Sequence, residues 1–320
     1  MSGSKKVLVT ATNFSALCAE GKRLLEEAGC VIVENQVGRP HTFEELVPLV
    51  GDVDGVIAGV DTWDEAVFKL APKLKAIARF GVGVDNIDLE KAKQYGIQVS
   101  NVPGGNANAV AELTVGLILC SMRSIPALHQ SARRGYWDRR VGTELAGRTV
   151  GLLGFGNIAR MVAKKLQGFD VNIIAYDKYP DEGKARESGV KLATSDEVLT
   201  QSDVVSMHLP SMPETRHMMN FRQFEMMKPT AHFINTARGA LVDEKALAFA
   251  LQTRQIAGAA IDVYEQEPVS SDNPLFQIDQ LVSTPHTAAE TEETYRRVGI
   301  ATAEALLNVF SGKEPAHLLR

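Results

Sequence analysis

The feature that most constrains the fold of this sequence is a repeating alternation of short apolar runs with amphipathic stretches. The runs are rich in Val, Ile and Ala, and the stretches between them place apolar residues at helical spacing. Buried strands that alternate with helices are typical of βαβ units and predict a parallel sheet. The predicted strands are Lys6–Thr10, Val31–Glu34, Gly55–Ala58, Ala76–Arg79, Gln98–Ser100, Thr149–Leu153, Asn172–Tyr176, Val204–Leu209, His232–Asn235, Gly258–Asp262 and Leu281–Ser283. The helices predicted in the first third are Ala16–Ala28, Phe43–Val50, Glu65–Leu70 and Leu89–Tyr95.

A long helical pattern from Ala107 to about Arg134 interrupts this alternation, and Pro126 marks a break or a new helix start within it. The alternation then restarts. Because a domain averages roughly 150 residues, two such series in 320 residues predict two doubly wound α/β domains. A last helix is predicted near Glu290–Phe310, and periodicity leaves open which domain it packs on.

Composition excludes several classes of protein. The chain has 34 Lys and Arg against 39 Asp and Glu, a formal net charge of −5, so it lacks the basic surface that nucleic acid or an anionic membrane attracts. No apolar run reaches the roughly 18 residues of a membrane span. Cys18, Cys30 and Cys120 are isolated and lack the spacing of metal ligands. We therefore expect a cytoplasmic protein with unpaired thiols, no metal site, and no nucleic-acid or membrane partner.

The sharpest local motif is a Gly-x-Gly-x-x-Ala turn between a predicted strand and a helix. Gly154 permits the tight turn, Gly156 lets a pyrophosphate approach the backbone, and Ala159 allows close packing of helix on strand. The backbone N–H groups at Asn157 and Ile158 lie at the positive end of the helix dipole, which favours phosphate. The motif predicts a dinucleotide-binding site.

An acidic residue ends the strand that follows this turn. Asp177 lies 23 residues after Gly154, close to the spacing of about 20 that dinucleotide sites show. Its carboxylate can accept hydrogen bonds from both hydroxyls of the adenosine ribose and would repel a 2′-phosphate. Asp177 therefore favours NAD over NADP, although Lys178 next to it weakens this preference.

Further motifs follow one another along nearly the whole chain: Arg79–Asp88, Asn101–Asn106, Val110–Glu112, His208–Pro210, Asn235–Gly239, Asp262–Pro268 and Thr284–His286. Their order and spacing resemble the D-isomer-specific 2-hydroxyacid dehydrogenase family, and within it the phosphoglycerate dehydrogenase-like branch. The resemblance implies a Rossmann NAD-binding domain, residues 104–287, inserted into a flavodoxin-like substrate-binding domain, residues 1–103 and 288–320. It also implies an active site in the cleft between the domains. A homodimer through the NAD-binding domain is implied as well, with the helical region after Ala107 as the contact.

The resemblance places Arg238, Glu267 and His286 at the catalytic positions. A guanidinium can hold the carboxylate of a 2-oxo acid with two parallel hydrogen bonds, which a lysine cannot do. An imidazole titrates near neutral pH and can exchange a proton with the substrate oxygen. Glu267 would bind the other ring nitrogen of His286. Glu265 is the competing acid, but the family's catalytic acid directly precedes the proline, as Glu267 does.

The resemblance also implies contacts with the cofactor. Asp262 is expected to hold the nicotinamide amide, and His208 to line the cofactor site without a catalytic role. The cofactor-binding residues that the glycine motif and the resemblance together predict are Gly154, Gly156, Asn157, Ile158, Asp177, His208, Pro210, Thr215, Thr236, Ala237, Arg238, Asp262, His286 and Ala288.

The substrate is expected at a glycine-rich loop of the first domain. Free N–H groups in this loop can form a concave anion site, and the predicted substrate-binding residues are Arg79, Gly81, Val82, Gly83 and Arg238. Phosphoglycerate dehydrogenases often place an arginine in the loop after the third strand, but Ala58–Thr62 has none, which puts a phosphorylated substrate in doubt. Arg39 is the alternative source of a cation.

These observations predict a reversible, NAD-linked reduction of a small 2-oxo acid to its D-2-hydroxy acid. Phosphohydroxypyruvate with 3-phosphoglycerate, and hydroxypyruvate or glyoxylate, stay open as substrates. The alternative is a binding protein that senses NAD(H), because some transcriptional co-repressors resemble the same family. Formate dehydrogenases share the fold but carry Gln where this chain has Glu267, which argues against that branch.

Overall fold

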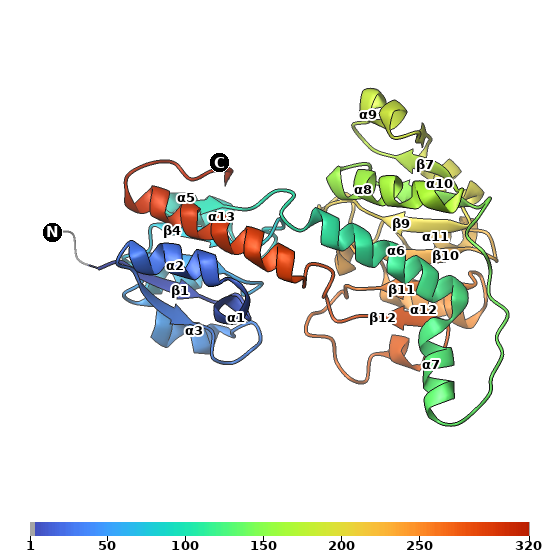
Figure 1. Ribbon diagram of the computed structural model, residues 1–320, viewed down its shortest axis with the longest axis horizontal. Helices are drawn as coiled ribbons and strands as arrows, with labels where there is room; N and C mark the ends of the chain where they lie inside the picture. Colours follow the sequence, from blue (N-terminus) through green and yellow to red (C-terminus); the bar gives the residue numbers. More distant parts are fainter. Residues whose placement is uncertain (1–3, 320) are drawn as a thin grey trace. The chain divides into compact units, whose positions relative to one another are not determined.

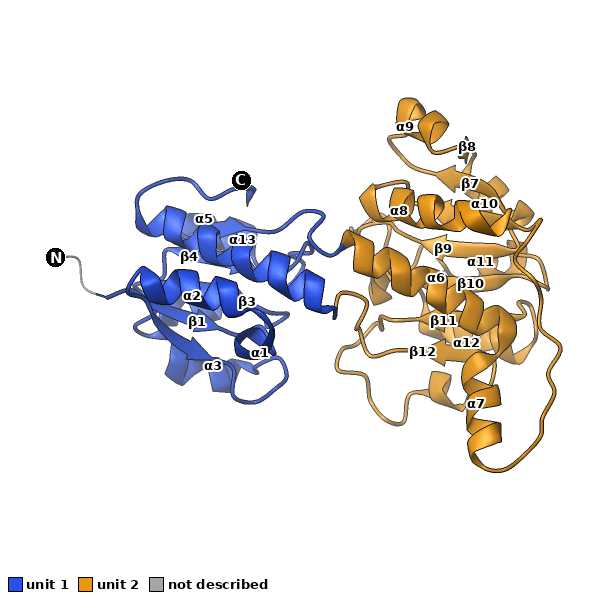
Figure 2. Ribbon diagram, in the orientation of Figure 1, with its two compact units in different colours: residues 1–106, 290–320 blue, residues 107–289 orange. Residues whose placement is uncertain are grey.

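The structure is a computed structural model and describes residues 4–319. The chain forms two compact units, unit 1 with residues 1–106 and 290–320, and unit 2 with residues 107–289 (Figure 2). Each unit contains one sheet with helices on both faces (Figure 1). The predicted α/β class with two largely parallel sheets is confirmed.

Unit 1 contains a six-stranded sheet in the order β13-β5-β4-β3-β1-β2. Five strands are parallel, and β13 is an antiparallel edge strand on β5. The sequence prediction missed β13, because two leucines near the end of the chain are too short a run to show a strand period. The strands are β1 (Lys6–Val9), β2 (Val31–Glu34), β3 (Gly55–Ala58), β4 (Ala76–Arg79), β5 (Gln98–Ser100) and β13 (Leu318–Leu319).

Two apolar cores cover the faces of the unit 1 sheet. One is formed with α3 (Phe43–Val50), α4 (Glu65–Leu70) and α5 (Leu89–Gln94), and the other with α1 (Phe14–Leu17), α2 (Ala19–Glu27) and α13 (Glu292–Phe310). The predicted helix Ala16–Ala28 is in fact two helices that meet at Cys18. Helix α2 packs so closely on α13 that a Cβ on Gly21 would lie 2.4 Å from the carbonyl oxygen of Gly299.

Unit 2 contains a seven-stranded parallel sheet in the order β12-β11-β10-β9-β6-β7-β8. Its strand bounds agree closely with the prediction because these strands are continuous buried apolar runs. The two-residue strand β8 was not predicted. The strands are β6 (Thr149–Leu153), β7 (Asn172–Tyr176), β8 (Lys191–Leu192), β9 (Val204–Met207), β10 (His232–Asn235), β11 (Gly258–Ile261) and β12 (Leu281–Ser283).

The helices of unit 2 also lie on two faces. One core joins the sheet to α6 (Ala107–Arg123) and α8 (Asn157–Leu166), and the other joins it to α10 (Ser195–Gln201), α11 (Phe221–Met226) and α12 (Glu244–Gln252). The remaining helices are α7 (Ile125–Arg133), α9 (Glu182–Glu187) and short 3₁₀ turns at Gln167–Phe169, Gly239–Leu241 and Pro274–Gln277. Among the described residues no single helix is long and apolar enough to cross a membrane. The bent pair α6–α7, with 65° between its members, passes that test by length and composition only.

The strand order fixes where each unit can bind a ligand. In unit 2 the chain proceeds from β6 outward to β7, then returns to β9 on the other side, and in unit 1 the same reversal separates β1 from β3. Open α/β sheets bind ligands at the carboxyl ends of the strands beside such a reversal. The predicted site residues follow β4 in unit 1 and β6, β7, β9, β10, β11 and β12 in unit 2, so each group lies at the carboxyl edge of its sheet.

Candidate active site

The loop that carries Arg238 is held by the last residue of β10. Asn235 is buried, and its side-chain amide donates to the carbonyl oxygen of Arg238 at 2.9 Å while its side-chain oxygen accepts from the Ala237 N–H at 3.0 Å. Nη1 of Arg238 donates to the Ala237 carbonyl oxygen at 2.7 Å. Thr236 is buried beside this loop and shares a hydrogen bond of 2.8 Å with Thr114 of α6. The backbone from which the guanidinium extends is therefore fixed at both ends.

Gly239 brings the Arg238 loop directly against the loop that carries Glu267. A Cβ at position 239 would lie 1.8 Å from the carbonyl oxygen of Tyr264 and 2.5 Å from the backbone nitrogen of Glu265. No side chain fits between two backbones at that separation. Glycine at this position is what allows residues following β10 and β11 to share one site.

Glu267 and His286 form a close pair. Nδ1 of His286 lies 2.6 Å from Oε2 of Glu267, which is the length of a strong hydrogen bond to a carboxylate. The other carboxylate oxygen of Glu267 accepts from the Tyr264 N–H at 2.9 Å. With Nδ1 bound to Glu267, Nε2 is the ring nitrogen left to exchange a proton with a substrate.

The charges around Glu267 keep its carboxylate ionised. Burial raises the pKa of Glu267, but the hydrogen bond and charge of His286, the Tyr264 N–H and the charge of Arg238 together hold that pKa below its ordinary value. The ionised carboxylate binds Nδ1 of His286 and fixes the orientation of the ring. This is the arrangement that an acid–base imidazole requires.

His286 lies on a strained loop that Asp262 holds in place. The φ angle of His286 is 54°, in the left-handed region that a residue with a Cβ rarely adopts. Asp262 is fully buried, and its carboxylate accepts from the hydroxyl of Thr284 at 2.5 Å and from the N–H groups of Thr287 and Ala288 at 2.9 Å each. Its carbonyl oxygen accepts from the His286 N–H at 2.7 Å. These bonds fix the loop on both sides of the histidine. The contact of Asp262 with the nicotinamide amide stays a prediction.

The turn after β6 has the shape that a dinucleotide requires. Gly154 has a φ of 98°, and a Cβ there would lie 2.8 Å from the backbone of His208. A Cβ on Gly156, in contrast, would meet nothing within 4 Å, so open space lies in front of this backbone. Helix α8 then begins at Asn157 and Ile158 with no side chain capping its first turn. The open backbone and the uncapped helix start fit a pyrophosphate.

Asp177 lies at the end of β7 beside this turn and is half-buried. Its Oδ2 accepts from the Phe155 N–H at 2.8 Å, and its Oδ1 accepts from the Tyr179 N–H at 2.9 Å. The Asp177 carboxylate therefore holds the backbone of the glycine turn. It also lies at the position where the ribose hydroxyls of a dinucleotide are expected. Each oxygen keeps a further lone pair for a ribose hydroxyl.

The loop after β9 contributes His208, Pro210 and Thr215. Burial lowers the pKa of His208 to about 4, so its ring is neutral at neutral pH, and its Nε2 lies 2.9 Å from the Ser206 hydroxyl. The Thr215 hydroxyl donates to the Pro210 carbonyl oxygen at 2.7 Å and accepts from the Met212 N–H at 2.8 Å. These hydrogen bonds within the loop hold its conformation next to Gly154.

In unit 1 the predicted substrate residues form the loop after β4. Gly81 has a φ of 145°, and the Arg79 guanidinium folds back over it to donate to the Phe80 carbonyl oxygen. Within residues 4–319, no acceptor is bonded to the backbone N–H groups of Val82 and Gly83. Two adjacent N–H groups without an acceptor are available to an anionic ligand.

Sequence reasoning missed a pair of glutamates, Glu244 and Glu265, that join the start of α12 to the segment just before Glu267. Glu265 accepts from the Glu244 N–H at 2.9 Å, and Glu244 accepts from the Glu265 N–H at 2.7 Å. His217 and Asn273 bind the remaining oxygens of Glu265 and Glu244, each at 2.9 Å. Glu265, the competing candidate acid, is thus bound to the start of α12 rather than to His286. In the sequence, only Asp243 followed by Glu244 indicated that a helix begins at this point. Nothing in the sequence indicated that Glu244 pairs with Glu265.

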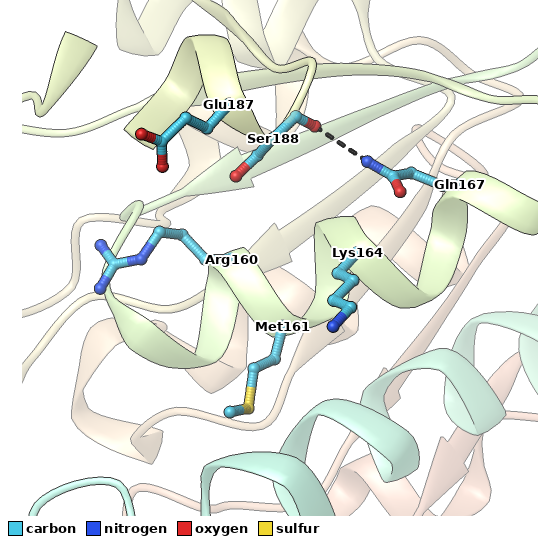
Figure 3. Close-up of a pocket in the computed structure, with 6 residues that line it drawn as sticks. All are labelled: Arg160, Met161, Lys164, Gln167, Glu187 and Ser188. Carbon is cyan, nitrogen blue, oxygen red and sulfur yellow. Dashed lines mark hydrogen bonds between the residues drawn. The ribbon is translucent and has the colours of Figure 1, made fainter. Parts of the chain in front are cut away.

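One hollow of about 330 Å³ opens at the surface between α8 and α9 (Figure 3). The Gln167 side-chain amide donates to the Ser188 carbonyl oxygen at its rim at 3.2 Å. None of the predicted site residues lines this hollow, so it is no candidate for the reaction. Its lining residues are Arg160, Met161, Lys164, Gln167, Glu187 and Ser188. Within residues 4–319, no cluster of three or more His, Cys, Asp or Glu side chains is placed to bind a metal.

Comparison with known proteins gives consistent matches. The profile described as "D-isomer specific 2-hydroxyacid dehydrogenase, NAD binding domain" matches residues 115–288. A D-3-phosphoglycerate dehydrogenase of Methanocaldococcus jannaschii is 41% identical over 312 residues, which is 96% of this chain and 58% of that protein. A glyoxylate reductase of Thermofilum pendens is 39% identical over 307 residues, which is 93% of this chain and 91% of that protein.

The similarity extends to solved structures. The TT0316 protein of Thermus thermophilus matches with a TM-score of 0.91 and 34% identity, over 98% of this chain and all of that chain. This chain spans a little over half the length of the D-3-phosphoglycerate dehydrogenases it matches. The profile match covers more than half of the chain and lies over the glycine turn and the Arg238, Glu267 and His286 loops. The chain belongs to the D-isomer specific 2-hydroxyacid dehydrogenase family.

Proposed function

We propose that this chain is an NAD-dependent D-2-hydroxyacid dehydrogenase that reversibly reduces a small 2-oxo acid. The observation that carries the proposal is the 2.6 Å contact between Nδ1 of His286 and the Glu267 carboxylate. The Arg238 loop is packed against the same site through Gly239. A carboxylate-bound imidazole beside an arginine is what proton exchange with a 2-oxo acid needs.

In this proposal the three side chains divide the work. Arg238 holds the substrate carboxylate with two parallel hydrogen bonds and orients the adjacent carbonyl. Protonated His286 donates from Nε2 to the carbonyl oxygen as negative charge develops there, and accepts the proton back in the oxidative direction. The ionised Glu267 stabilises the imidazolium through Nδ1 and fixes the ring.

The cofactor is proposed to bind along the carboxyl edge of the unit 2 sheet. NADH, when bound, supplies the hydride for reduction. The open backbone at Gly156 would receive its pyrophosphate and Asp177 its adenosine ribose. The remaining predicted contacts, in the loops after β9, β10, β11 and β12, would line the rest of the dinucleotide. The Asp177 carboxylate would repel a 2′-phosphate, so NAD is preferred over NADP.

The substrate carboxylate is proposed to meet the N–H groups of Val82 and Gly83, with Arg79 and Gly81 shaping that loop. Relatives named as D-3-phosphoglycerate dehydrogenase and as glyoxylate reductase both support a small 2-hydroxy or 2-oxo acid. We place the activity in the cytoplasm, because the three free cysteines are typical of a reducing compartment.

We further propose a homodimer formed through unit 2. The segment after α7 has no secondary structure and exposes large apolar side chains, with Trp137 91% exposed and Val141 fully exposed. Such side chains are usually covered by a partner. Replacing both with Asp should convert a dimer to a monomer in light scattering. A wild-type chain that is already monomeric would refute the proposal.

The test of the activity is a panel of 2-oxo acids with NADH, followed at the nicotinamide absorbance. The panel contains glyoxylate, pyruvate, hydroxypyruvate and phosphohydroxypyruvate. We expect NADH oxidation with at least one acid and loss of most turnover in Arg238→Ala. A chain that binds NADH tightly but reduces none of these acids would instead support the NAD(H)-sensing alternative.

A further inference from the structure

Glu265 lies where three loops of unit 2 meet. It belongs to the loop after β11, two residues before Glu267. Its Oε2 lies 2.9 Å from Nε2 of His217 in the loop after β9, and its Oε1 accepts from the N–H of Glu244 at the start of α12. A Cβ on Gly239, in the loop after β10, would lie only 2.5 Å from the Glu265 backbone nitrogen. A residue without a part in the proposed reaction is therefore in contact with all the loops around it.

The hydrogen bonds between Glu244 and Glu265 hold two backbone segments against each other. Glu244 accepts from the Glu265 N–H at 2.7 Å, and Glu265 accepts from the Glu244 N–H at 2.9 Å. The Asn273 side-chain amide donates to the second oxygen of Glu244 at 2.9 Å. Helix α12 is a firm support for this pair, because Ala246 and Leu247 in its first turns are buried in the core. The backbone of Glu265 is therefore fixed relative to the core of unit 2.

The segment that contains Glu265 also holds the Glu267 carboxylate. The N–H of Tyr264, directly before Glu265, donates to Oε1 of Glu267 at 2.9 Å. Only Gln266 separates Glu265 from Glu267, so a shift of the Glu265 backbone would move the acid. The other oxygen of Glu267, Oε2, lies 2.6 Å from Nδ1 of His286. The geometry of the proposed acid–base pair thus depends on a segment that α12 holds in place.

His217 provides a second support, from the loop after β9. Its φ angle is 49°, and its N–H donates to the Ala240 carbonyl oxygen at 2.9 Å. The Met219 N–H donates to the Leu241 carbonyl oxygen at 3.0 Å, so this stretch runs beside the loop after β10. The backbone of His217 is therefore anchored, and its ring bridges from there to Glu265.

Stability alone does not account for these contacts. The side chains of Glu265 and His217 are 29% and 35% exposed, and hydrogen bonds at that exposure compete with water and add little to the free energy of folding. Misplacing a reacting group by about 1 Å, in contrast, costs about 100-fold in rate. Loss of these contacts should therefore affect turnover more than folding.

We propose that Glu265 is a positioning residue that sets the orientation of Glu267 against His286. The inference rests on the proposed function. Glu265 acts through the backbone of residues 264–267 and not through contact with substrate. It therefore needs two hydrogen-bonding atoms but no negative charge. His217 holds Glu265 from the loop after β9 and is a positioning residue in the same sense.

The experiment compares Glu265→Ala with Glu265→Gln in steady-state reduction of the 2-oxo acid that the wild type reduces fastest. Ala removes both hydrogen bonds of the side chain, so kcat should fall about 10- to 100-fold while KM for the acid stays nearly unchanged. Gln keeps an oxygen for the Glu244 N–H and an amide that can donate to Nε2 of His217, so it should recover most of the lost kcat. A Gln variant as slow as the Ala variant would overturn the inference, because the charge would then be what matters.

The matched control is Asp203→Ala. Asp203 lies directly before β9, at the amino edge of the same sheet, and accepts from the Thr149 N–H at 2.9 Å and from Nζ of Lys228 at 3.0 Å. Like Glu265, it thus binds one backbone N–H and one side chain. Because it is only 16% exposed, its loss should lower the thermal transition at least as much as Glu265→Ala does. The control should keep the wild-type kcat. Equal falls in kcat for the two variants would overturn the inference.

His217→Asn tests the same support when Glu265→Ala does not fold. Asn tolerates the left-handed backbone, is too short to bridge to Glu265, and leaves the Glu244–Glu265 hydrogen bonds in place. We expect kcat to fall about fivefold, the equivalent of one hydrogen bond. A kcat equal to that of the wild type would contradict the role of these contacts.

Crystal structures of the wild type and of His217→Asn and Glu265→Ala separate this inference from the proposed function. The distance between Nδ1 of His286 and Oε2 of Glu267, 2.6 Å in the wild type, should exceed about 3.5 Å in Glu265→Ala. Failure of the wild type to reduce any 2-oxo acid would remove the proposed activity and leave this distance as the test. An unchanged distance in both variants would remove the positioning role, whether or not the chain turns over.

Discussion

The loops that carry the proposed acid–base residues of unit 2 differ from the β3 and β4 loops of unit 1 in how they are held. In unit 2, the backbones that carry Arg238, Glu267 and His286 are each held by short hydrogen bonds or by a backbone contact. Around the β3 and β4 loops of unit 1, Oδ2 of Asp61, Nδ1 of His41 and the N–H groups of Val82 and Gly83 have no hydrogen-bond partner in the described part of the chain. A proton transfer needs its groups fixed before substrate arrives, whereas a recognition site can leave its hydrogen bonds to the ligand.

Because of this difference, changes in unit 2 should lower turnover and changes in unit 1 should alter substrate binding. The largest effect is expected for His286→Ala, which removes the proposed proton donor. Turnover should fall about 10²- to 10⁴-fold in steady-state reduction assays, the usual value of general acid–base catalysis. The control His317→Asn alters an exposed histidine of unit 1 with a left-handed backbone that Asn tolerates, and should be silent. Near-normal turnover in His286→Ala would place the proton donor elsewhere.

Gly239→Ala tests whether the contact between the two loops matters. Its Cβ would lie 1.8 Å from the Tyr264 carbonyl oxygen, so the Arg238 and Glu267 loops must separate. We expect turnover to fall about 100-fold, the cost of misplacing reacting groups by about 1 Å, and the thermal transition to move down by several degrees. Gly168→Ala is the matched control because its Cβ meets nothing within 4 Å. Equal effects of the two variants would contradict the proposed contact.

Glu267→Gln tests the carboxylate in the acid–base pair. Reduction needs a protonated donor, and a neighbouring carboxylate favours a positive charge, so the alkaline limit of the reduction profile should move to lower pH in this variant. Turnover at pH 7 should drop about tenfold. An unmoved pH profile argues against the pair.

The same variant has a signature in stability. The pKa of Glu267 is held below its ordinary value of 4.5 in the folded chain, so the ionised group stabilises the fold above that pH. This contribution is lost as pH falls through the lowered value. In urea unfolding, the free energy of unfolding should therefore be higher for wild type than for Glu267→Gln at neutral pH. The two values should converge in acid. A gap that stays constant with pH would contradict the assigned shift.

The smallest effect is expected in unit 1. The Asn101 side-chain amide donates to the Val82 carbonyl oxygen at 2.7 Å and supports the loop that we propose to bind the substrate carboxylate. Asn101→Ala removes one hydrogen bond, worth about 1 kcal/mol, so KM should rise about fivefold with kcat nearly unchanged. A fall in kcat with constant KM would contradict the view that unit 1 acts on substrate binding and unit 2 on turnover.

Most of the strands could be predicted from the sequence. Buried parallel strands are continuous apolar runs, so most of their bounds could be predicted, and Arg238, Glu267 and His286 follow strands whose carboxyl ends meet at one edge. The edge strands β8 and β13 were missed because two residues have no detectable period.

Side-chain pairing between distant segments was less visible. The Glu244–Glu265 hydrogen bonds and the Asp61–His41 pair each join residues about 20 positions apart. Whether such residues are buried depends on how distant segments pack. No local pattern marks an acid as buried or a histidine as its neighbour. Likewise, nothing in the sequence showed that Arg39 binds Glu45, because both lie in an exposed stretch where many pairings are possible.

The most direct test of the acid–base assignment is a crystal structure of the whole chain with NADH and oxamate, an unreactive analogue of a 2-oxo acid. The account predicts the oxamate carboxylate on the Arg238 guanidinium, its oxo oxygen within hydrogen-bond distance of Nε2 of His286, and Nδ1 still on Glu267. Oxamate bound away from both Arg238 and His286 would contradict it.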